Sequence, residues 1–353
     1  MNKVYINSIA SISAQRTFDN TEFLNDVILH TETVLPVVNP NYKDFIPAAA
    51  ARRMAKGIKM GVVASKLALD EAGLNNVDAI ITGTGMGCVR DSEKFVSAII
   101  DNNEQYLTPT SFIQSTHNTV GGQIALGINC KGYNFTYVHS STSFESALLD
   151  AKLMLACDEA TSILVGGVDE LGEHTIKIHR LINHIKQAPV QSNNLLQSNT
   201  EGAIFSEGAN FFVLSNEKIH TSYAEVIAVK TYNTVTDSIS TLITDFLQQH
   251  NVTEDLIDVL VLGNNGDVNY DHAYNDLSFG MFSKTQQVYY KHLCGEFNTA
   301  SSFGVWLASK IIKTQNIPDC VRLNHVTNNN FEYVLLYNQY RGENHSLTLL
   351  RKC

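Results

Sequence analysis

The sequence lacks a long apolar run, a basic stripe and a signal peptide. None of its apolar stretches approaches the roughly 20 residues needed to cross a bilayer, so we expect a soluble protein. It contains 25 Lys and Arg residues and 35 Asp and Glu residues, which gives a formal net charge of −10. Because the cationic residues are scattered apart from Arg52-Arg53, neither nucleic acid nor a membrane is an expected partner. Residues 1–14 lack the charged start, apolar centre and cleavage site of a secretory signal.

Paired cysteines are also absent. The six cysteines are far apart and form neither a CxxC pair nor a metal-ligand spacing: Cys88, Cys130, Cys157, Cys294, Cys320 and Cys353. We therefore expect reduced thiols, a cytoplasmic location and no bound metal. The glycine-rich turn 83–87 fails the GxGxxG spacing and lacks the acidic residue of a dinucleotide site, so neither NAD nor another cofactor is expected.

What the sequence does contain is a regular alternation of strands and helices. With 353 residues, of which 44% are hydrophobic, the chain is long enough for two domains or two fused halves. Apolar runs predict strands, and apolar residues at helical spacing predict helices. The predicted strands are 3–13, 78–85, 133–139, 162–167, 223–229 and 257–262, and the predicted helices are 48–72, 143–157, 239–250 and 301–313.

The second half of the chain repeats the strand and helix order of the first half. We therefore predict an α/β fold of two duplicated βαβ-type halves, 1–218 and 219–353, with mostly parallel sheets and layered helices. The functional site is expected where strand ends from both halves meet. The polar segment 187–200 is interpreted as a surface loop at the substrate entrance.

One turn between a predicted strand and helix resembles a known nucleophile region. It reads Val138-His139-Ser140-Ser141-Thr142-Ser143, and an apolar strand ending in Gly166-Gly167 follows. This pattern resembles the nucleophile segment of the β-ketoacyl-ACP synthases, and an ungapped alignment back from Gly166-Gly167 puts Ser141 at the position of the catalytic cysteine. Other segments that match the family in the same order are 109–112, 115–118, 121–124 and 205–209. The resemblance covers nearly the whole chain and implies a thiolase-like fold with αβαβα layers.

The chain departs from the catalytic residues that the resemblance implies. Condensation in this family uses a cysteine thiolate and two histidines. Here Asn265, in the turn 263–266, stands at the first histidine position and Glu296 at the second, while the neighbouring Lys291 is retained. A serine at position 141 has too high a pKa for a helix dipole to ionise it. An ionised Glu296 would repel a developing enolate, and the amide of Asn265 cannot act as a base.

The family's glycine-rich segment near the C-terminus corresponds to residues 328–333, which contain no glycine. The oxyanion hole that this segment supplies is therefore not expected to form. Together the departures resemble a chain-length factor, the noncatalytic ketosynthase-like subunit of type II polyketide, aryl polyene and flexirubin pathways. The implied partners are an active β-ketoacyl-ACP synthase in a heterodimer, or a second copy of this chain in a homodimer, and acyl carrier protein.

The resemblance also implies an interface and a role. Residues 109–122 and the strand 133–139 correspond to the family's dimer interface and substrate channel. The residues implied at the interface or along the acyl tunnel are Phe112, Thr116, Asn118, His139 and Phe331. The implied role is to complete the tunnel of an active partner and to limit the length of the acyl chain.

Two other functions remain open from the residues. Ser141 could be the nucleophile of a serine-dependent acyltransferase or hydrolase, served by His139 or His117. A serine at the start of a helix is more often an N-cap, and Glu296 is expected to form an ion pair with Lys291. A module that binds a ligand other than an acyl chain is the third class, because a fold does not determine a function.

Overall fold

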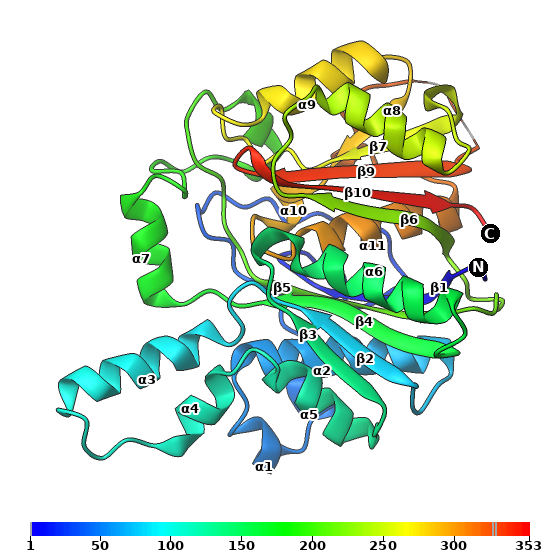
Figure 1. Ribbon diagram of the computed structural model, residues 1–353. Coiled ribbons are helices and arrows are strands. Elements are labelled where there is room, and N and C mark those ends of the chain that lie inside the picture. The colour runs from blue at the N-terminus through cyan, green and yellow to red at the C-terminus, as the bar shows by residue number, and fades with distance from the viewer. Residues whose placement is uncertain (1, 327, 329) are drawn as a thin grey trace.

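A sheet of ten strands runs through the protein (Figure 1). The computed structural model describes residues 2–326, 328 and 330–353. The strand order is β3-β2-β4-β5-β1-β6-β10-β9-β7-β8. The strands are β1 Tyr5–Ile12, β2 Ala79–Gly83, β3 Tyr133–Tyr137, β4 Ser162–Asp169, β5 Gly208–Ser215, β6 Ala224–Tyr232, β7 Ile257–Leu262, β8 Gln286–Tyr289, β9 Tyr333–Tyr340 and β10 Glu343–Arg351.

The sheet consists of two halves with the same internal order. Read inward from its two edges, it runs β3-β2-β4-β5-β1 in the first half and β8-β7-β9-β10-β6 in the second. The halves join where β1 pairs with β6 through Tyr5–Glu225 and Ile6–Ala224. The duplicated α/β fold predicted from the sequence is therefore confirmed. The boundary at 218/219 falls between β5 and β6 and stays a prediction.

The sheet is mixed, so the expectation of mostly parallel strands is wrong. The pairs β2–β3, β2–β4, β7–β8 and β7–β9 are parallel, and the remaining pairs are antiparallel. Every residue of the antiparallel strand β5 is buried. Its apolar run, 211–214, is typical of a strand that helices cover on both faces of the sheet. Such a run does not tell whether the neighbouring strands are parallel or antiparallel to it.

Helices cover the strands in layers (Figure 1). They are α1 Ala48–Ala51, α2 Lys56–Ala72, α3 Val89–Asp101, α4 Pro109–Ser115, α5 Thr119–Ile128, α6 Ser143–Ala156, α7 Glu173–Leu181, α8 Ile239–Gln249, α9 His272–Asp276, α10 Lys291–Cys294 and α11 Ser301–Thr314. Phe144 of α6 and Trp306 of α11 lie in the central core between the two halves. Val63 of α2 belongs to the core outside the first half, and Phe246 of α8 to the core outside the second. This arrangement gives the predicted αβαβα layers.

The predicted helix 48–72 is interrupted in the structure. It divides into α1 and α2, and Ala55 between them has extended backbone angles. The amide N–H of Ala55 donates to Oε1 of Gln114 at 3.2 Å. This tertiary hydrogen bond takes the place of the backbone hydrogen bond that the same N–H would make in a continuous helix. The predicted end of the helix at Gly73 is confirmed, because Gly73 adopts φ 70° at the C-cap.

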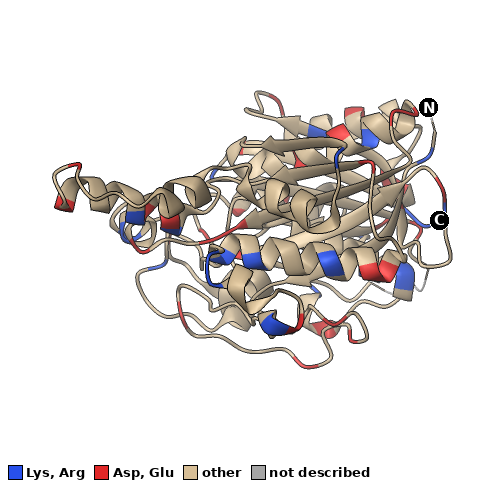
Figure 2. Ribbon diagram, turned by 90° about the horizontal axis from the view of Figure 1, so that it is seen from below, with Lys and Arg blue, Asp and Glu red and all other residues tan. Residues whose placement is uncertain are grey.

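The α3–α4 segment forms an arm that projects sideways from the body (Figure 2). Its large apolar side chains include several that face solvent: Val96, Ile100, Tyr106, Phe112 and Ile113. Within the described residues, no helix is long and apolar enough to cross a bilayer.

Candidate functional site

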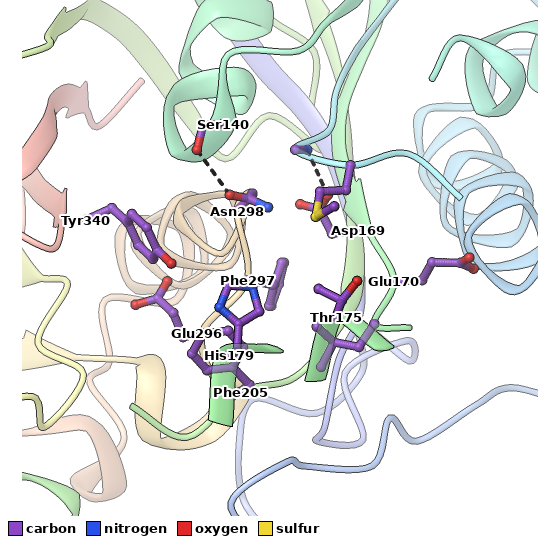
Figure 3. A pocket seen from close by; sticks show the side chains of 13 residues that line it. Ser140, Asp169, Glu170, Thr175, His179, Phe205, Glu296, Phe297, Asn298 and Tyr340 are labelled. Carbon is purple, nitrogen blue, oxygen red and sulfur yellow. Dashed lines mark hydrogen bonds between the residues drawn. The ribbon is translucent and has the colours of Figure 1, made fainter. Parts of the chain in front are cut away.

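A pocket of about 230 Å³ lies where strand ends of both halves meet (Figure 3). Asp169 ends β4 in the first half, and Tyr340 ends β9 in the second. The strand order thus gives the location that the sequence predicts for the site. The other principal lining residues are Gly85, Met86, Ser140, Glu170, Leu171, Thr175, His179, Phe205, Glu296, Phe297 and Asn298.

The Asp169 carboxylate joins two segments at the pocket through hydrogen bonds. Its Oδ1 accepts hydrogen bonds from the Thr84 hydroxyl at 3.0 Å and from the Gly85 N–H at 2.8 Å. Its Oδ2 accepts from the N–H and hydroxyl of Thr299 at 2.9 and 2.8 Å. Burial raises the pKa of Asp169, although these four donors act in the opposite direction. A Cβ at Gly85 would overlap the Asn298 side chain, so this close approach requires glycine.

Asn265, Lys291 and Glu296 form one buried cluster beside the pocket. The Lys291 ammonium and the Asn265 side-chain amide both donate to Oε2 of Glu296, each at 2.7 Å. All three side chains are buried, whereas Glu296 also lines the pocket. The structure therefore brings together three of the residues selected from the sequence and shows the expected Lys291–Glu296 ion pair. Neither Asn265 nor Glu296 offers an imidazole to a bound substrate.

The turn that carries Asn265 is held by its own side chains. The Asp267 N–H donates to Oδ1 of Asn265 at 3.1 Å, which closes the turn expected for an Asn-Gly pair. Asp271 accepts from the amide N–H groups of Asn265 and Gly266 at 3.1 and 2.8 Å. Burial raises the pKa of Asp271 to about 6 from its ordinary 3.8.

We expect the Asp271→Asn variant to lose part of the pH dependence of stability. Because the pKa of this carboxyl is higher in the folded protein than in the unfolded chain, its protonation favours the folded state. This stabilisation is complete below pH 4 and is lost as the pH rises to about 6. One pKa unit corresponds to about 1.4 kcal/mol, and the partial exposure of Asp271 lowers the expected total to about 2 kcal/mol. The free energy of unfolding, measured by urea denaturation at pH 4 to 7, should therefore decline more steeply in the wild type than in Asp271→Asn. Asp276→Asn, at an exposed position nearby, controls for loss of a charge, and equal pH profiles for wild type and Asp271→Asn would contradict the expectation.

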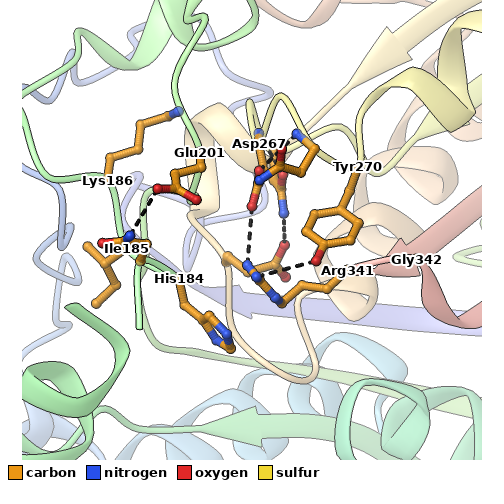
Figure 4. Close-up of polar contacts among 12 residues, drawn as sticks. His184, Ile185, Lys186, Glu201, Asp267, Tyr270, Arg341 and Gly342 are labelled. Atoms are coloured by element: carbon orange, nitrogen blue, oxygen red, sulfur yellow. Dashed lines mark hydrogen bonds and ion pairs between the residues drawn. The ribbon is translucent and has the colours of Figure 1, made fainter. Parts of the chain in front are cut away.

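Two cations that the sequence analysis missed support the same turn (Figure 4). The buried Lys186 ammonium donates to the Gly266 carbonyl at 2.8 Å, to the Ser198 hydroxyl at 3.0 Å and to the Thr200 carbonyl at 3.1 Å. Burial lowers its pKa. Arg341 forms an ion pair with the buried Asp267 at 3.2 Å. These contacts join distant parts of the chain, so no local sequence signal identifies Lys186 or Arg341.

Through Ser198 and Thr200, the segment 187–200 holds the Lys186 ammonium that contacts the turn at Gly266. The segment contributes no residue to the pocket lining. Its Ser192 and Leu195 are buried, although most of the segment is exposed. The location at the substrate entrance stays a prediction.

Ser140, and not Ser141, presents its hydroxyl to the pocket. Ser141 is only 2% exposed, and its Oγ has no hydrogen-bond partner among the described residues. Ser140 lines the pocket, has φ 52° and lies 3.4 Å from Oδ1 of Asn298. The expected N-cap hydrogen bond of Ser141 is not found in this part of the chain. The alignment of Ser141 with the family's cysteine stays a prediction.

The two histidines considered as bases for Ser141 have other contacts. Nδ1 of His139 lies 3.1 Å from the Ser146 hydroxyl, and His117 packs against Gly87. The imidazole that lines the pocket belongs to His179, whose Nδ1 lies 3.1 Å from Nδ1 of His184. Burial lowers the pKa of both of these rings, that of His184 to about 4. Both rings therefore favour the uncharged form, in which the N–H of one Nδ1 can donate to the other Nδ1.

The other residues selected from the sequence do not line this pocket. Phe112, Thr116, Asn118 and His139 are exposed, and Phe112 packs against Phe95 with ring centroids 5.3 Å apart. Phe331 is buried in the central core, where its N–H donates to Gln315. Of the C-terminal segment 328–333, residue 329 lies outside the described residues, so the absence of an oxyanion hole there stays a prediction.

The pocket residues that the sequence analysis missed include Asp169, His179 and Tyr340. A signal was present for Asp169, because it follows Gly166-Gly167 at the end of a buried strand, where a carboxylate would be placed at the site. Tyr340 and His179 stand in segments with no motif. Groups of three or more potential metal ligands do not occur in the described residues.

Comparison with known proteins identifies a related family. The family model described as "Beta-ketoacyl synthase, N-terminal domain" matches residues 8–220. A search of curated protein sequences gave no significant match.

Solved structures of similar proteins cover the whole chain. "The ishigamide ketosynthase/chain length factor" shares 16% identity with a TM-score of 0.78, over 100% of this chain and 99% of that chain. A ketosynthase (ApeO) in complex with its chain length factor (ApeC), from Xenorhabdus doucetiae, shares 14% identity with a TM-score of 0.77, over 100% of this chain and 98% of that chain. A type II PKS acyl-carrier protein in complex with its ketosynthase (AntDE:AntF) shares 16% identity with a TM-score of 0.74, over 100% of both chains. At such low identity these matches establish a common fold.

Proposed function

Because the chain belongs to the β-ketoacyl synthase family, we propose that it is a noncatalytic subunit of the chain-length-factor type. It would pair with an active β-ketoacyl-ACP synthase in a polyketide, fatty-acid or aryl polyene type of pathway. In that complex it would wall off the acyl tunnel while the partner carries out condensation. The similarity to chains from ketosynthase/chain length factor structures supports this proposal.

The observation that carries the proposal is the Asn265–Lys291–Glu296 cluster. Decarboxylative condensation leaves an enolate, which needs hydrogen-bond donors that point at its oxygen. Here both donors of the cluster point at Oε2 of Glu296 instead. A carboxylate in this position repels an enolate, so the cluster stabilises the fold and opposes the condensation.

The size of the pocket agrees with this function. At about 230 Å³ it is smaller than the roughly 300–1,000 Å³ of typical small-molecule sites. Phe205, Phe297 and Tyr340 occupy its walls. A growing acyl chain would therefore have to lie mainly in the partner or between the two subunits.

The edge strand β3 and the α3–α4 arm are the proposed interface. β3 ends the sheet at one edge and is exposed over Tyr133–Phe135, whose rings stack with centroids 6.0 Å apart. At the opposite edge, all four residues of β8 are buried. An open edge with exposed aromatic side chains invites pairing with another chain. A partner subunit at β3 would cover this edge and the apolar side chains of the arm.

The second candidate is a serine-dependent acyltransferase, and the position of Ser140 is the observation in its favour. Ser140 presents a hydroxyl to the pocket from a strand-to-helix turn with positive φ, the backbone setting of many serine nucleophiles. This reading replaces Ser141 with Ser140 as the attacking residue. Among the described residues, no base is hydrogen-bonded to that hydroxyl, although a serine nucleophile requires one.

Intact-protein mass spectrometry separates the two candidates. The chain would be incubated with the candidate ketosynthase, acyl-ACP and malonyl-ACP, and the mass of each subunit followed. We expect the ketosynthase alone to gain the acyl mass while the two subunits elute as one complex. An acyl adduct on this chain that vanishes in Ser140→Ala but persists in Ser141→Ala would instead establish the acyltransferase.

A further inference from the structure

The α3–α4 arm is attached to the body mainly at its base. The structure describes all of α3, and Val89 at its start is the one residue of that helix that is buried. Figure 2 shows the arm projecting sideways from the body. Where the chain returns, Gln114 of α4 accepts from the N–H of Ala55, directly before α2, at 3.2 Å. The position of the arm therefore depends on a few contacts at its base.

Glu170, at the wall of the pocket, makes two of these contacts. It follows Asp169 at the end of β4, lines the pocket and is 3% exposed (Figure 3). Its Oε2 accepts from the N–H of Gly57 at 2.6 Å, and its Oε1 accepts from the N–H of Arg90 at 3.0 Å. Gly57 and Arg90 are the second residues of α2 and α3. One carboxyl group thus holds the starts of both helices.

Neither of these helices has an N-cap side chain of its own. The N-cap residues are Ala55 for α2 and Cys88 for α3, and neither forms a side-chain cap hydrogen bond in the described part of the chain. A side-chain oxygen at the N-cap normally accepts from a free N–H of the first turn. Glu170 takes this role for two helices at once, with its carboxyl oxygens at the positive ends of both helix dipoles.

A second buried carboxylate, that of Glu207, reinforces the base of the arm. It forms ion pairs with Lys56, the first residue of α2, and with Arg90 at 3.2 Å. It also accepts from the N–H of Leu171 at 3.1 Å, and the Leu171 carbonyl accepts from Nε of Arg90 at 2.7 Å. These contacts join the segment after β4 to the starts of α2 and α3. Together with the hydrogen bonds of Glu170, they fix the point at which the arm leaves the body.

We propose that Glu170 is a positioning residue for subunit assembly, because from the wall of the pocket it fixes the direction of the α3–α4 arm. This inference rests on the proposed function, in which the arm packs against an active ketosynthase. The exposed side chains of Ile100, Phe112 and Ile113 meet a partner surface together when the arm is held in one orientation. A segment that is positioned before binding loses less conformational entropy on binding than a mobile one. The buried Glu170 thus acts on the partner through the arm.

Hydrogen exchange of the isolated chain tests the contacts of Glu170 without a partner. In Glu170→Gln the side chain keeps its size, but its NH2 group faces one of the two N–H groups that the carboxyl oxygens accept. We expect amide exchange in residues 89–115 to become about fivefold faster, the effect of losing a helix cap. Exchange in β4 and β5 should stay as in the wild type. Glu173→Gln, which removes an exposed carboxylate nearby, should leave the arm unchanged.

The affinity for the ketosynthase tests the link to assembly. Sedimentation velocity should show about tenfold weaker assembly for Glu170→Gln and wild-type affinity for Glu173→Gln. Double-mutant cycles then show whether Glu170 acts through the arm. Most of the tenfold loss should disappear in the Ile100→Ser/Ile113→Ser background, which lacks apolar contacts of the arm, and persist in the Tyr133→Ala background, which alters β3. A role in stability alone would give the same loss in both backgrounds.

Two results would overturn the positioning role: wild-type exchange in residues 89–115 of Glu170→Gln, and an equal loss of affinity in the two backgrounds. If Glu170→Gln does not fold, Arg90→Gln replaces it, because this change opens the ion pair with Glu207 and keeps the backbone hydrogen bond to Glu170. Faster exchange of the arm is expected there too, and unchanged exchange would reject the proposal. Failure of the wild-type chain to bind any ketosynthase would count against the proposed function, and the exchange of the arm would then decide whether Glu170 holds it.

Discussion

Replacing Lys291 by methionine is expected to lower the free energy of unfolding by about 3–5 kcal/mol, because it leaves a buried carboxylate without its cation. Lys291 and Glu296 are 1% and 3% exposed, so water cannot take the place of the ammonium. Methionine approximates the length of the lysine stem, and the loss therefore reports mainly on the charge. Urea denaturation at a fixed protein concentration, with the midpoint and slope fitted together, gives this free energy.

A double-mutant cycle separates the pair from the packing around it. Glu296→Gln alone should also destabilise the fold, because it leaves the ammonium of Lys291 unpaired. In the double variant Lys291→Met/Glu296→Gln, no charge is left in this cluster, and a glutamine can still accept from Asn265. We expect the double variant to recover most of the loss, with a coupling energy of about 2 kcal/mol or more. A cost below about 1 kcal/mol for Lys291→Met, or strictly additive losses, would refute the ion pair as the centre of this cluster.

Replacing Phe135 by aspartate should weaken assembly with the partner subunit by about 100-fold, the effect of losing an interface hot spot worth about 2–4 kcal/mol. Phe135 is 45% exposed on the edge strand β3, and its ring lies between those of Tyr133 and Tyr137. An aspartate in this position removes the aromatic contact and adds a charge that an interface would have to desolvate. Sedimentation velocity over a range of concentrations measures the affinity.

The matched control is Phe279→Asp. Phe279 is 81% exposed and lies after α9, outside the proposed interface. Both variants exchange an exposed phenylalanine for a charge, so each should keep the circular dichroism spectrum and unfolding midpoint of the wild type. If Phe135→Asp assembles as tightly as Phe279→Asp does, β3 is not the interface.

The duplication could be predicted from the sequence, whereas the strand directions could not. Ile80 and Ile81 are consecutive residues of β2, and they point to the outer and the central core. Burial on both faces makes a strand apolar throughout, whether its neighbours run parallel or antiparallel to it. The apolar run at 162–167 therefore indicated a covered strand correctly, and the inference from coverage to direction failed at β5.

The cluster beside the pocket was within reach of the sequence because the family resemblance pointed to its members. Asn265 and Glu296 were selected as replacements of two residues that must meet in the family's site, and their side chains do form a hydrogen bond. Ser140 was passed over for Ser141, since an alignment gives a position in the chain and not the direction of a side chain. Arg341 pairs with Asp267 across the turn at the end of the sheet, a long-range contact that one sequence does not reveal.

The place of β1 in the sheet determines when it can fold during synthesis on the ribosome. Tyr5 pairs with Ser215, and β1 has β5 on one side and β6 on the other. At about 5–20 residues per second, the roughly 200 intervening residues take about 10–40 s to appear. Throughout that interval a largely apolar strand has neither neighbour available. Because β2 waits only about 50 residues for β3, β1 is the strand of the first half that stays unpaired longest during synthesis.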